Sequence, residues 1–146
     1  MNTAKDLSKE PPRSPRVRLS GYALMARMSD KGRADIDGTA GEYHFACPLD
    51  QTLFEFKGVN ADEVRKVIAN GASDEELVSW FNSHGAPKTA AEIKAWSDGV
   101  EAEKPYEDPE SKEWFAGECE RLGLDPAKTT LCDYLDTDDR VSFGKK

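Results

Sequence analysis

Apolar residues recur three and four positions apart along most of this chain, the spacing that places them on one face of an α-helix. The first such stretch predicts a helix over residues 17–35. The residues of its apolar face are Leu19, Tyr22, Ala23 and Ala26. A second stretch predicts a short helix from Pro48 to Gly58. The alternation of residues 54–56 also fits a strand, but no partner strand is evident, so we favour the helix.

Three further helix starts carry the capping-box pattern, in which a polar side chain bonds the amide three residues on and an acid reaches back. The pairs are Asn60 with Glu63, Ser73 with Glu76, and Thr89 with Glu92. Gly71 and Gly85 are suited to left-handed C-caps. Two more helices are predicted from Asp108-Pro109 and Asp125-Pro126, which place an N-cap before a proline.

These elements predict an all-α fold, a compact irregular bundle of six or seven short helices. Short helices depend on packing their apolar faces together. We expect residues 13–146 to form a single helical domain, which suits a chain of 146 residues. Residues 1–12 are predicted to be a flexible tail, and residues 136–146 a polar one.

The charge is uneven along the chain. Residues 5–18 hold five basic and two acidic side chains. We interpret this as a flexible, solvated basic arm, although its arginines also suit folding back on acidic residues or binding an anion. The whole chain carries a formal charge of -8. That balance argues against nucleic-acid partners and against an anionic membrane surface, since both bind clustered Lys and Arg.

Three cysteines at scattered positions, Cys47, Cys119 and Cys132, are unsuited to a disulfide framework. No apolar run approaches the roughly 18 residues of a membrane-spanning helix, and the first residues lack the apolar segment of a secretory signal. We therefore expect a cytoplasmic protein.

Residues 41–50 concentrate the reactive side chains of the chain. If a helix begins at Pro48, Cys47 lies at the positive end of its dipole, which favours a thiolate nucleophile. His44 is a candidate base for that thiol, and Glu42 or Asp50 a candidate partner of the imidazole. The alternative is that Cys47 is a small buried apolar residue.

The same segment suggests two kinds of bound species. His44-x-x-Cys47 offers two zinc ligands, but zinc sites usually show paired short spacings and this chain has one, so we predict no metal. Free amides at the start of the helix suit an anion or small ligand. The candidate ligand-binding residues are Arg16, Tyr22, Lys31, Arg33, Tyr43 and Asp50. The competing interpretation makes Arg27, Lys31 and Arg33 part of a solvated face, and Asp50 a residue that only complements the helix dipole.

His84 is expected to cap its helix, and Trp80, Trp96 and Trp114 to pack in the core. The chain lacks the P-loop, the dinucleotide-binding glycine pattern and the common hydrolase motifs. No particular cofactor is predicted.

Several separated motifs together resemble a bacterial family known as domain of unknown function 5069. They are Pro12-Arg13-Ser14-Pro15-Arg16, Leu19-x-Gly21-Tyr22, Asp30-Lys31-x-Arg33-Ala34, the segment from Gly41 to Asp50, and Ser73-Asp74-Glu75-Glu76-x-x-x-Trp80. The resemblance covers residues 12–143. It implies a small cytoplasmic bacterial protein without an assigned activity, and it transfers no site residues.

Two functions follow as hypotheses. The first is a small-molecule or anion pocket beside residues 42–50, with Cys47 and His44 as candidate catalytic residues. The second is a non-enzymatic module whose acidic C-terminal third docks a basic protein, since residues 101–146 hold 13 acidic and 7 basic side chains.

Overall fold

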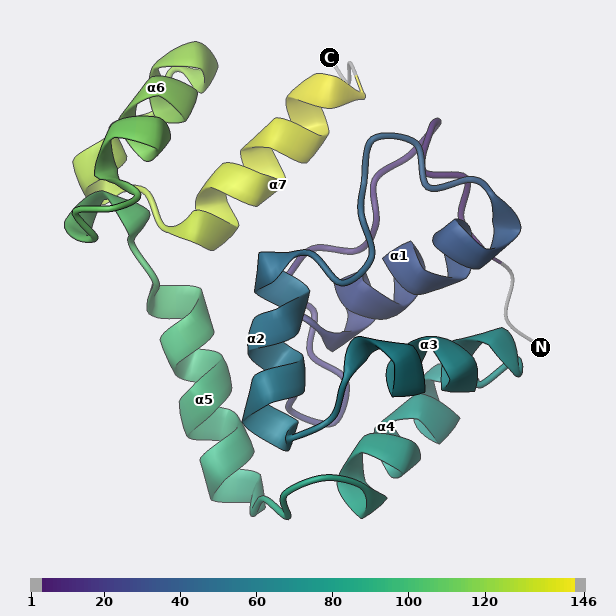
Figure 1. The fold of residues 1–146 in the computed structure, drawn as a ribbon. Helices are drawn as coiled ribbons and strands as arrows, with labels where there is room; N and C mark the ends of the chain where they lie inside the picture. Colours follow the sequence, from purple (N-terminus) through teal and green to yellow (C-terminus); the bar gives the residue numbers. More distant parts are fainter. Residues whose placement is uncertain (1–3, 144–146) are drawn as a thin grey trace.

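The structure is a computed structural model that describes residues 4–143, and within this range it is all-α, with seven α-helices, two short 3-10 helices and no strand (Figure 1). The prediction of the fold class is confirmed. The elements are α1 (Met25–Asp37), α2 (Pro48–Lys57), α3 (Ala61–Ala69), α4 (Asp74–Ser83), α5 (Ala90–Ala102), η1 (Pro105–Glu107), α6 (Lys112–Leu122), η2 (Pro126–Lys128) and α7 (Leu131–Ser142).

The helix from Pro48 and the three predicted capping boxes are confirmed. Each cap side chain accepts a hydrogen bond from the amide three residues on, and each glutamate accepts from the cap amide. A fourth box, Thr130 with Asp133, starts α7. As expected, His84 caps α4, and its Nδ1 lies 2.9 Å from the carbonyl oxygen of Trp80.

The predicted helix over residues 17–35 is wrong in its first part, because α1 begins only at Met25. Residues 19–22 form a tight turn instead, in which Leu19 and Tyr22 exchange backbone hydrogen bonds of 3.1 and 3.0 Å. Ser20 and Leu24 have positive φ values of 49° and 72°, which a right-handed helix does not contain. The turn is fixed by Ser97 of α5, whose hydroxyl donates to the carbonyl of Gly21 and accepts from the amide of Ala23.

Two helix starts in the C-terminal part of the chain also differ from the prediction. Asp108 does not cap a helix; it accepts from the amide of Glu110 and the hydroxyl of Ser111, and α6 begins at Lys112. Asp125 caps only the single turn of η2. Part of the predicted polar tail, residues 136–142, belongs to α7.

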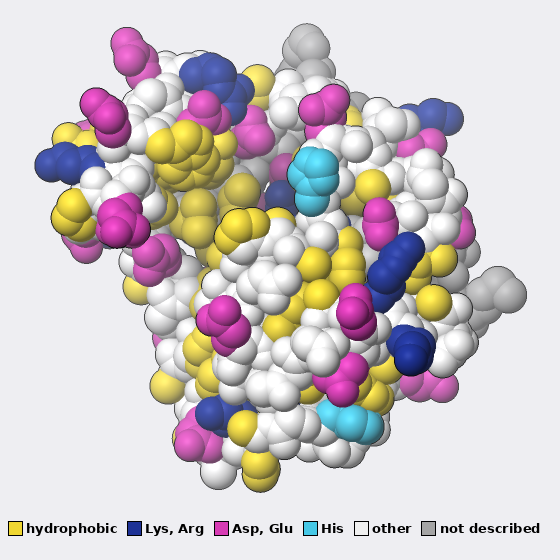
Figure 2. All heavy atoms as spheres, in the orientation of Figure 1, with side chains coloured by type: hydrophobic (Ala, Val, Ile, Leu, Met, Phe, Trp, Pro, Cys, Tyr) yellow, Lys and Arg dark blue, Asp and Glu magenta, His cyan; other side chains and the backbone are white. Residues whose placement is uncertain are grey.

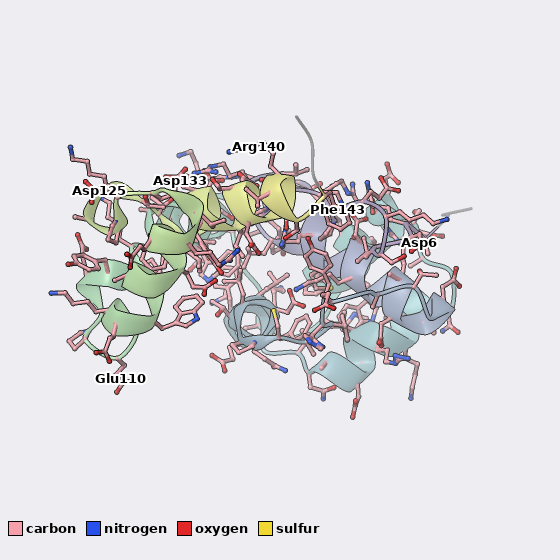
Figure 3. All side chains as sticks on the ribbon, turned by 90° about the horizontal axis from the view of Figure 1, so that it is seen from above. Asp6, Glu110, Asp125, Asp133, Arg140 and Phe143 are labelled. Carbon is pink, nitrogen blue, oxygen red and sulfur yellow. The ribbon has the colours of Figure 1, made fainter. Side chains whose placement is uncertain are left out.

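The helices form two lobes with separate apolar clusters. The N-terminal lobe, α1–α5, contains the larger cluster. Its buried members are Tyr22, Met25, Met28, Leu53, Phe54, Val64, Ile68, Leu77, Val78, Phe81 and Ile93. The C-terminal lobe, η1–α7, has a small one made of Phe115, Cys119 and Tyr134. α7 runs from the C-terminal lobe back toward α1, so that Phe143 lies on the side of the N-terminal lobe (Figures 1 and 3).

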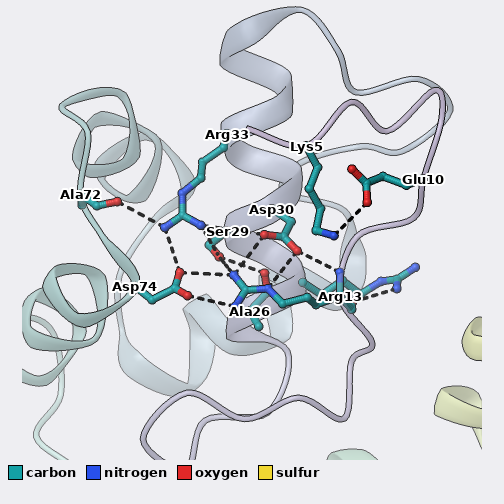
Figure 4. Close-up of polar contacts among 10 residues, drawn as sticks. Lys5, Glu10, Arg13, Ala26, Ser29, Asp30, Arg33, Ala72 and Asp74 are labelled. Carbon is teal, nitrogen blue, oxygen red and sulfur yellow. Dashed lines mark hydrogen bonds and ion pairs between the residues drawn. The ribbon is translucent and has the colours of Figure 1, made fainter. Parts of the chain in front are cut away.

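The basic arm, interpreted above as solvated, folds back on acidic residues. Arg13 binds Asp30 and Asp74, and Arg33 of α1 joins them from the other side of Asp74 (Figure 4). Further ion pairs tie the arm to α5 and α7: Arg16 pairs with Asp133 and Asp136, and Arg18 with Asp98 and Glu101.

Within the segment expected to be a tail, Leu7 is 1% exposed and its amide donates to the carbonyl of Thr39. Residues 1–3 lie outside the described range. The arm therefore lies against the helices from Leu7 onward.

Candidate functional site

A folded loop of residues 38–47 leads from α1 into α2. Gly41 has a φ of 58°, and a β-carbon there would lie 2.7 Å from the carbonyl oxygen of Leu7, so glycine permits the close contact between loop and arm. At the other end, the amide of Ala46 donates to the carboxylate of Asp50, 3.0 Å away. The loop is thus held at both ends, and its reactive side chains have defined positions.

The start of α2 brings together an ammonium, a thiol and a carboxylate. Lys31 Nζ lies 3.2 Å from Cys47 Sγ and 3.0 Å from Asp50 Oδ2. Lys31 and Asp50 are 4% and 2% exposed, so neither belongs to a solvated face. Burial raises the pKa of the Asp50 carboxyl above its ordinary value, and Lys31 opposes that shift. Asp50 therefore does more than complement the helix dipole, because it is the counter-ion of a buried lysine.

Cys47 is the N-cap residue of α2, as expected, but its side chain forms no capping hydrogen bond. The contact of its sulfur is with Lys31. His44 is exposed, and among the contacts of residues 4–143 no hydrogen bond joins it to Cys47 or to an acid. A nucleophilic thiol at this position would have Lys31 as its neighbour, with His44 available to a ligand instead.

A second buried cluster lies beside the first. Arg27 Nη1 and Nη2 donate to the two carboxylate oxygens of Asp139 on α7, at 2.8 and 3.3 Å. The hydroxyl of Tyr43 donates to the same carboxylate at 2.6 Å. Burial, and after it the hydrogen bond to the negatively charged Asp139, raises the pKa of the Tyr43 phenol, so the phenol stays protonated and donates. Phe143 stacks on Tyr43 with ring centroids 6.4 Å apart, which adds an apolar contact between the lobes.

Between the lobes lies a cleft of about 1170 Å³, which includes the predicted segment on one wall. The N-terminal lobe contributes side chains from α1, the loop and α2, and the C-terminal lobe contributes side chains from η1, α6 and α7. Figure 2 shows the hollow between the part that carries α6 and the rest of the molecule, with hydrophobic side chains on its α6 side.

Some of the predicted site residues line this cleft and others do not. Those that line it are Lys31, Tyr43, His44 and Cys47. Tyr22 is fully buried in the larger apolar cluster, where its hydroxyl donates to Asn82. Arg16 and Arg33 are used in ion pairs with acids of the same chain. Asp50 lies behind Lys31.

The alternative interpretation of residues 27–37 as a solvated face is wrong for the three basic residues that it includes. Arg27 and Lys31 are each 4% exposed, and the side chain of Arg33 is 10% exposed. Each contacts a carboxylate that lies far from it in sequence: Asp139, Asp50 and Asp74. Arg27 and Lys31 are therefore part of the structural framework of the cleft, and Arg33 part of the ion-pair network with Asp74.

The opposite wall of the cleft, above all Trp114, was not predicted from the sequence. This indole was expected in the core, yet it is 53% exposed and lines the cleft. It packs edge-on against Tyr134, with ring centroids 5.6 Å apart. Trp80 and Trp96, by contrast, pack against the larger cluster as expected. The apolar spacing around Trp114 gave no signal of its exposure.

Two further properties of the chain concern metal binding and membrane spanning. Within residues 4–143 no group of three or more His, Cys, Asp or Glu side chains lies close enough to hold a metal ion. None of the helices in that range has the length and apolar composition that crossing a membrane requires.

The fold defines a small two-lobed helical protein with a cleft between its lobes. The sequence profile of a family described as domain of unknown function 5069 matches residues 9–141, and the chain belongs to this family. The resemblance found in the sequence motifs is thereby confirmed. A comparison with curated proteins found no match.

Proposed function

We propose that this protein binds a small organic molecule in the cleft between its two lobes. The observation that carries the proposal is that one hollow joins the loop of residues 41–47 to the half-exposed indole of Trp114. A single exposed apolar side chain needs no explanation, but one that joins other apolar residues in the wall of a groove is typical of a binding site. Trp114 lies against a cleft rather than on a flat face, which favours a ligand that enters between the walls.

The composition of the walls supports the same proposal. Ligand sites are lined mostly by apolar groups with a few polar ones that fix orientation. The apolar lining residues include Leu7, Pro48, Leu49, Val100, Pro105, Leu131 and Leu135. Most of the lining surface is apolar although polar side chains also line it, and two of these, His44 and Cys47, lie on the loop described above. We assign His44 and Cys47 the role of contacting the ligand, with Lys31 positioning the Cys47 sulfur.

Docking of a basic protein on the C-terminal third is the second hypothesis, and the ion pairs favour it less. Many acids of this region already bind arginines of the same chain. These acids are Glu101, Glu118, Asp133, Asp136, Asp138 and Asp139. The charge of these six of the thirteen acids is therefore compensated within the molecule, which reduces the charge that could attract a basic surface.

Native mass spectrometry of the protein purified from cells that naturally make it tests the proposal. We expect a retained small mass in the wild type, and its loss in Trp114→Ala and in the double variant His44→Ala/Cys47→Ala. His84→Ala is the matched control, because His84 is also exposed but lies outside the cleft. It should keep the bound mass.

A bare mass in the wild type as well as in the cleft variants would contradict ligand binding. A stoichiometric protein partner that dissociates at high salt would support the second hypothesis instead. Circular dichroism of each variant shows that the loss of the mass does not reflect unfolding.

A further inference from the structure

The charges along the cleft identify the class of molecule that fits it. Two cationic side chains line the walls, Arg27 and Lys31, and each faces a buried carboxylate behind it: Asp139 for Arg27 and Asp50 for Lys31. Because these pairs are closed by short contacts, neither cation is free to neutralise an incoming anion. An anionic ligand would have to compete with a counter-ion already in place.

The carboxylates on the cleft are less well compensated. Four of them line it: Glu42 on the loop, Glu103 after α5, Asp108 after η1 and Asp138 on α7. Asp138 binds Arg121. Among the described residues, the carboxylate of Asp108 accepts hydrogen bonds only from neutral groups, the Glu110 amide and the Ser111 hydroxyl.

Glu42 and Glu103 differ from the other two carboxylates. Neither side chain has a hydrogen bond or ion pair to any of the described residues. Three carboxylates that line the cleft, those of Glu42, Glu103 and Asp108, thus have no cationic partner among residues 4–143. The field inside it favours positive charge.

The aromatic wall adds a second requirement. Trp114 presents more than half of its surface to solvent beside the cleft. An indole attracts organic cations through the negative face of its ring and gains from contact with apolar groups. A ligand that combines a positive charge with an aromatic or aliphatic body would meet both the indole and the carboxylates.

We propose that the ligand of this cleft is an organic cation, an amine or quaternary ammonium with an apolar body, held by Trp114 and by the carboxylates of Glu42 and Glu103. This inference rests on the proposed small-molecule site and adds the charge of its ligand. It replaces the anion that the basic residues of the sequence suggested, because those residues have their counter-ions inside the protein.

Three probes that share a phenyl ring separate the charge classes: benzyltrimethylammonium, benzyl alcohol and benzoate. Their binding is followed by chemical-shift changes in two-dimensional NMR spectra, including the indole N–H signal of Trp114. We expect benzyltrimethylammonium to shift signals of the loop and of α6, and to bind at least tenfold more tightly than benzoate. High salt should reduce that difference, since screening weakens the attraction of the carboxylates.

Variants locate the interaction. Trp114→Ala should weaken benzyltrimethylammonium about tenfold, and Glu42→Gln/Glu103→Gln severalfold. Glu120→Gln is the control, because Glu120 is an exposed acid of α6 outside the cleft lining. It should leave the affinity unchanged.

Equal or tighter binding of benzoate at the cleft would overturn the cationic class while leaving the small-molecule site intact. Equal or tighter binding of benzyl alcohol would likewise overturn the cationic class and leave the small-molecule site intact. If benzyltrimethylammonium shifts no cleft signals, or if its affinity is the same in the Glu42/Glu103 double variant as in Glu120→Gln, the inference fails. The proposed function is judged separately by the mass retained from the natural source.

Discussion

The contacts inside each of the two lobes differ in kind from the contacts between the lobes. The N-terminal lobe buries an apolar cluster contributed by all five of its helices and by the preceding turn, whereas the apolar cluster of the C-terminal lobe has three buried members. Between the lobes, polar contacts are prominent: Arg16 with Asp133, Arg27 with Asp139 and Tyr43 with Asp139. Apolar burial is the larger stabilising contribution in most folds. The N-terminal lobe therefore carries most of the stability, and polar pairs fix how the two lobes lie across the cleft.

The strongest test of this comparison truncates one aromatic side chain in each cluster. Phe81→Ala and Phe115→Ala both remove fully buried rings, and such changes lower the free energy of unfolding by about 3–5 kcal/mol. We expect Phe81→Ala to speed amide hydrogen exchange throughout the chain. Phe115→Ala should speed it chiefly in α6 and α7, because their cluster is separate. Equal loss of protection in α3 and α4 for both variants would show that the lobes unfold as one unit.

The buried ion pair between the lobes should give the next largest effect. Asp139→Asn leaves the guanidinium of Arg27 without its counter-ion in a buried position, which lowers stability by about 3 kcal/mol. Tyr43→Phe removes one hydrogen bond to the same carboxylate and should lower stability by about 1 kcal/mol.

Urea denaturation measures both interlobe effects. Asp35→Asn is the matched control, because the pair of Asp35 with Arg65 is exposed on both sides and contributes about 0–1 kcal/mol. A loss in Asp139→Asn no larger than in this control would refute the role of the buried pair.

Lowering the pH tests two carboxylates: that of Asp133, which pairs between the lobes, and that of Asp74, in the ion-pair network of the N-terminal lobe. Burial disfavours the charged forms of Asp133 and Asp74. Hydrogen bonds outweigh it and lower both pKa values: from Thr130 and Arg16 to Asp133, and from Arg13 and Arg33 to Asp74. A pKa lowered by folding means that the carboxylate stabilises the fold above pH about 4, its unfolded value, and loses this effect as the pH falls through the folded value.

Denaturation at pH 6 and pH 3 checks this sign. The wild type should lose more stability on acidification than either Asp133→Asn or Asp74→Asn, which lack the titrating group. An identical loss in all three proteins would mean that neither carboxylate contributes to the acid response.

The smallest expected effect is a difference in the alkylation rates of the three cysteines. Cys119 and Cys132 are at most 1% exposed. Burial raises the pKa of both thiols, to about 11 for Cys132, and both features slow alkylation. Cys47 is half-buried on the cleft wall.

Iodoacetamide labelling followed by peptide mass spectrometry should therefore modify Cys47 first. Cys119 should follow in proportion to the opening of the C-terminal lobe, and faster in Phe115→Ala. If Cys119 reacts as fast as Cys47 in the wild type, the C-terminal cluster is not closed in solution.

The sequence by itself determined the helical class, four of the helix starts and the segment that forms one wall of the cleft. These features depend on local chemistry. A capping box such as Ser73 with Glu76 is complete within four residues. The start of α2 is likewise local, because Pro48 occupies its first position. Local patterns also singled out His44 and Cys47, and both line the cleft.

Tertiary structure alone decided the turn at residues 19–24, the partners of the arginines and the second wall of the cleft. Ser97 stabilises that turn from 74 positions away, and Arg27 meets Asp139 across 112 positions. Periodicity reports which residues share a helical face, but it does not report what covers that face. For this reason Trp114 looked like a core residue in the sequence and lies on an open cleft in the fold.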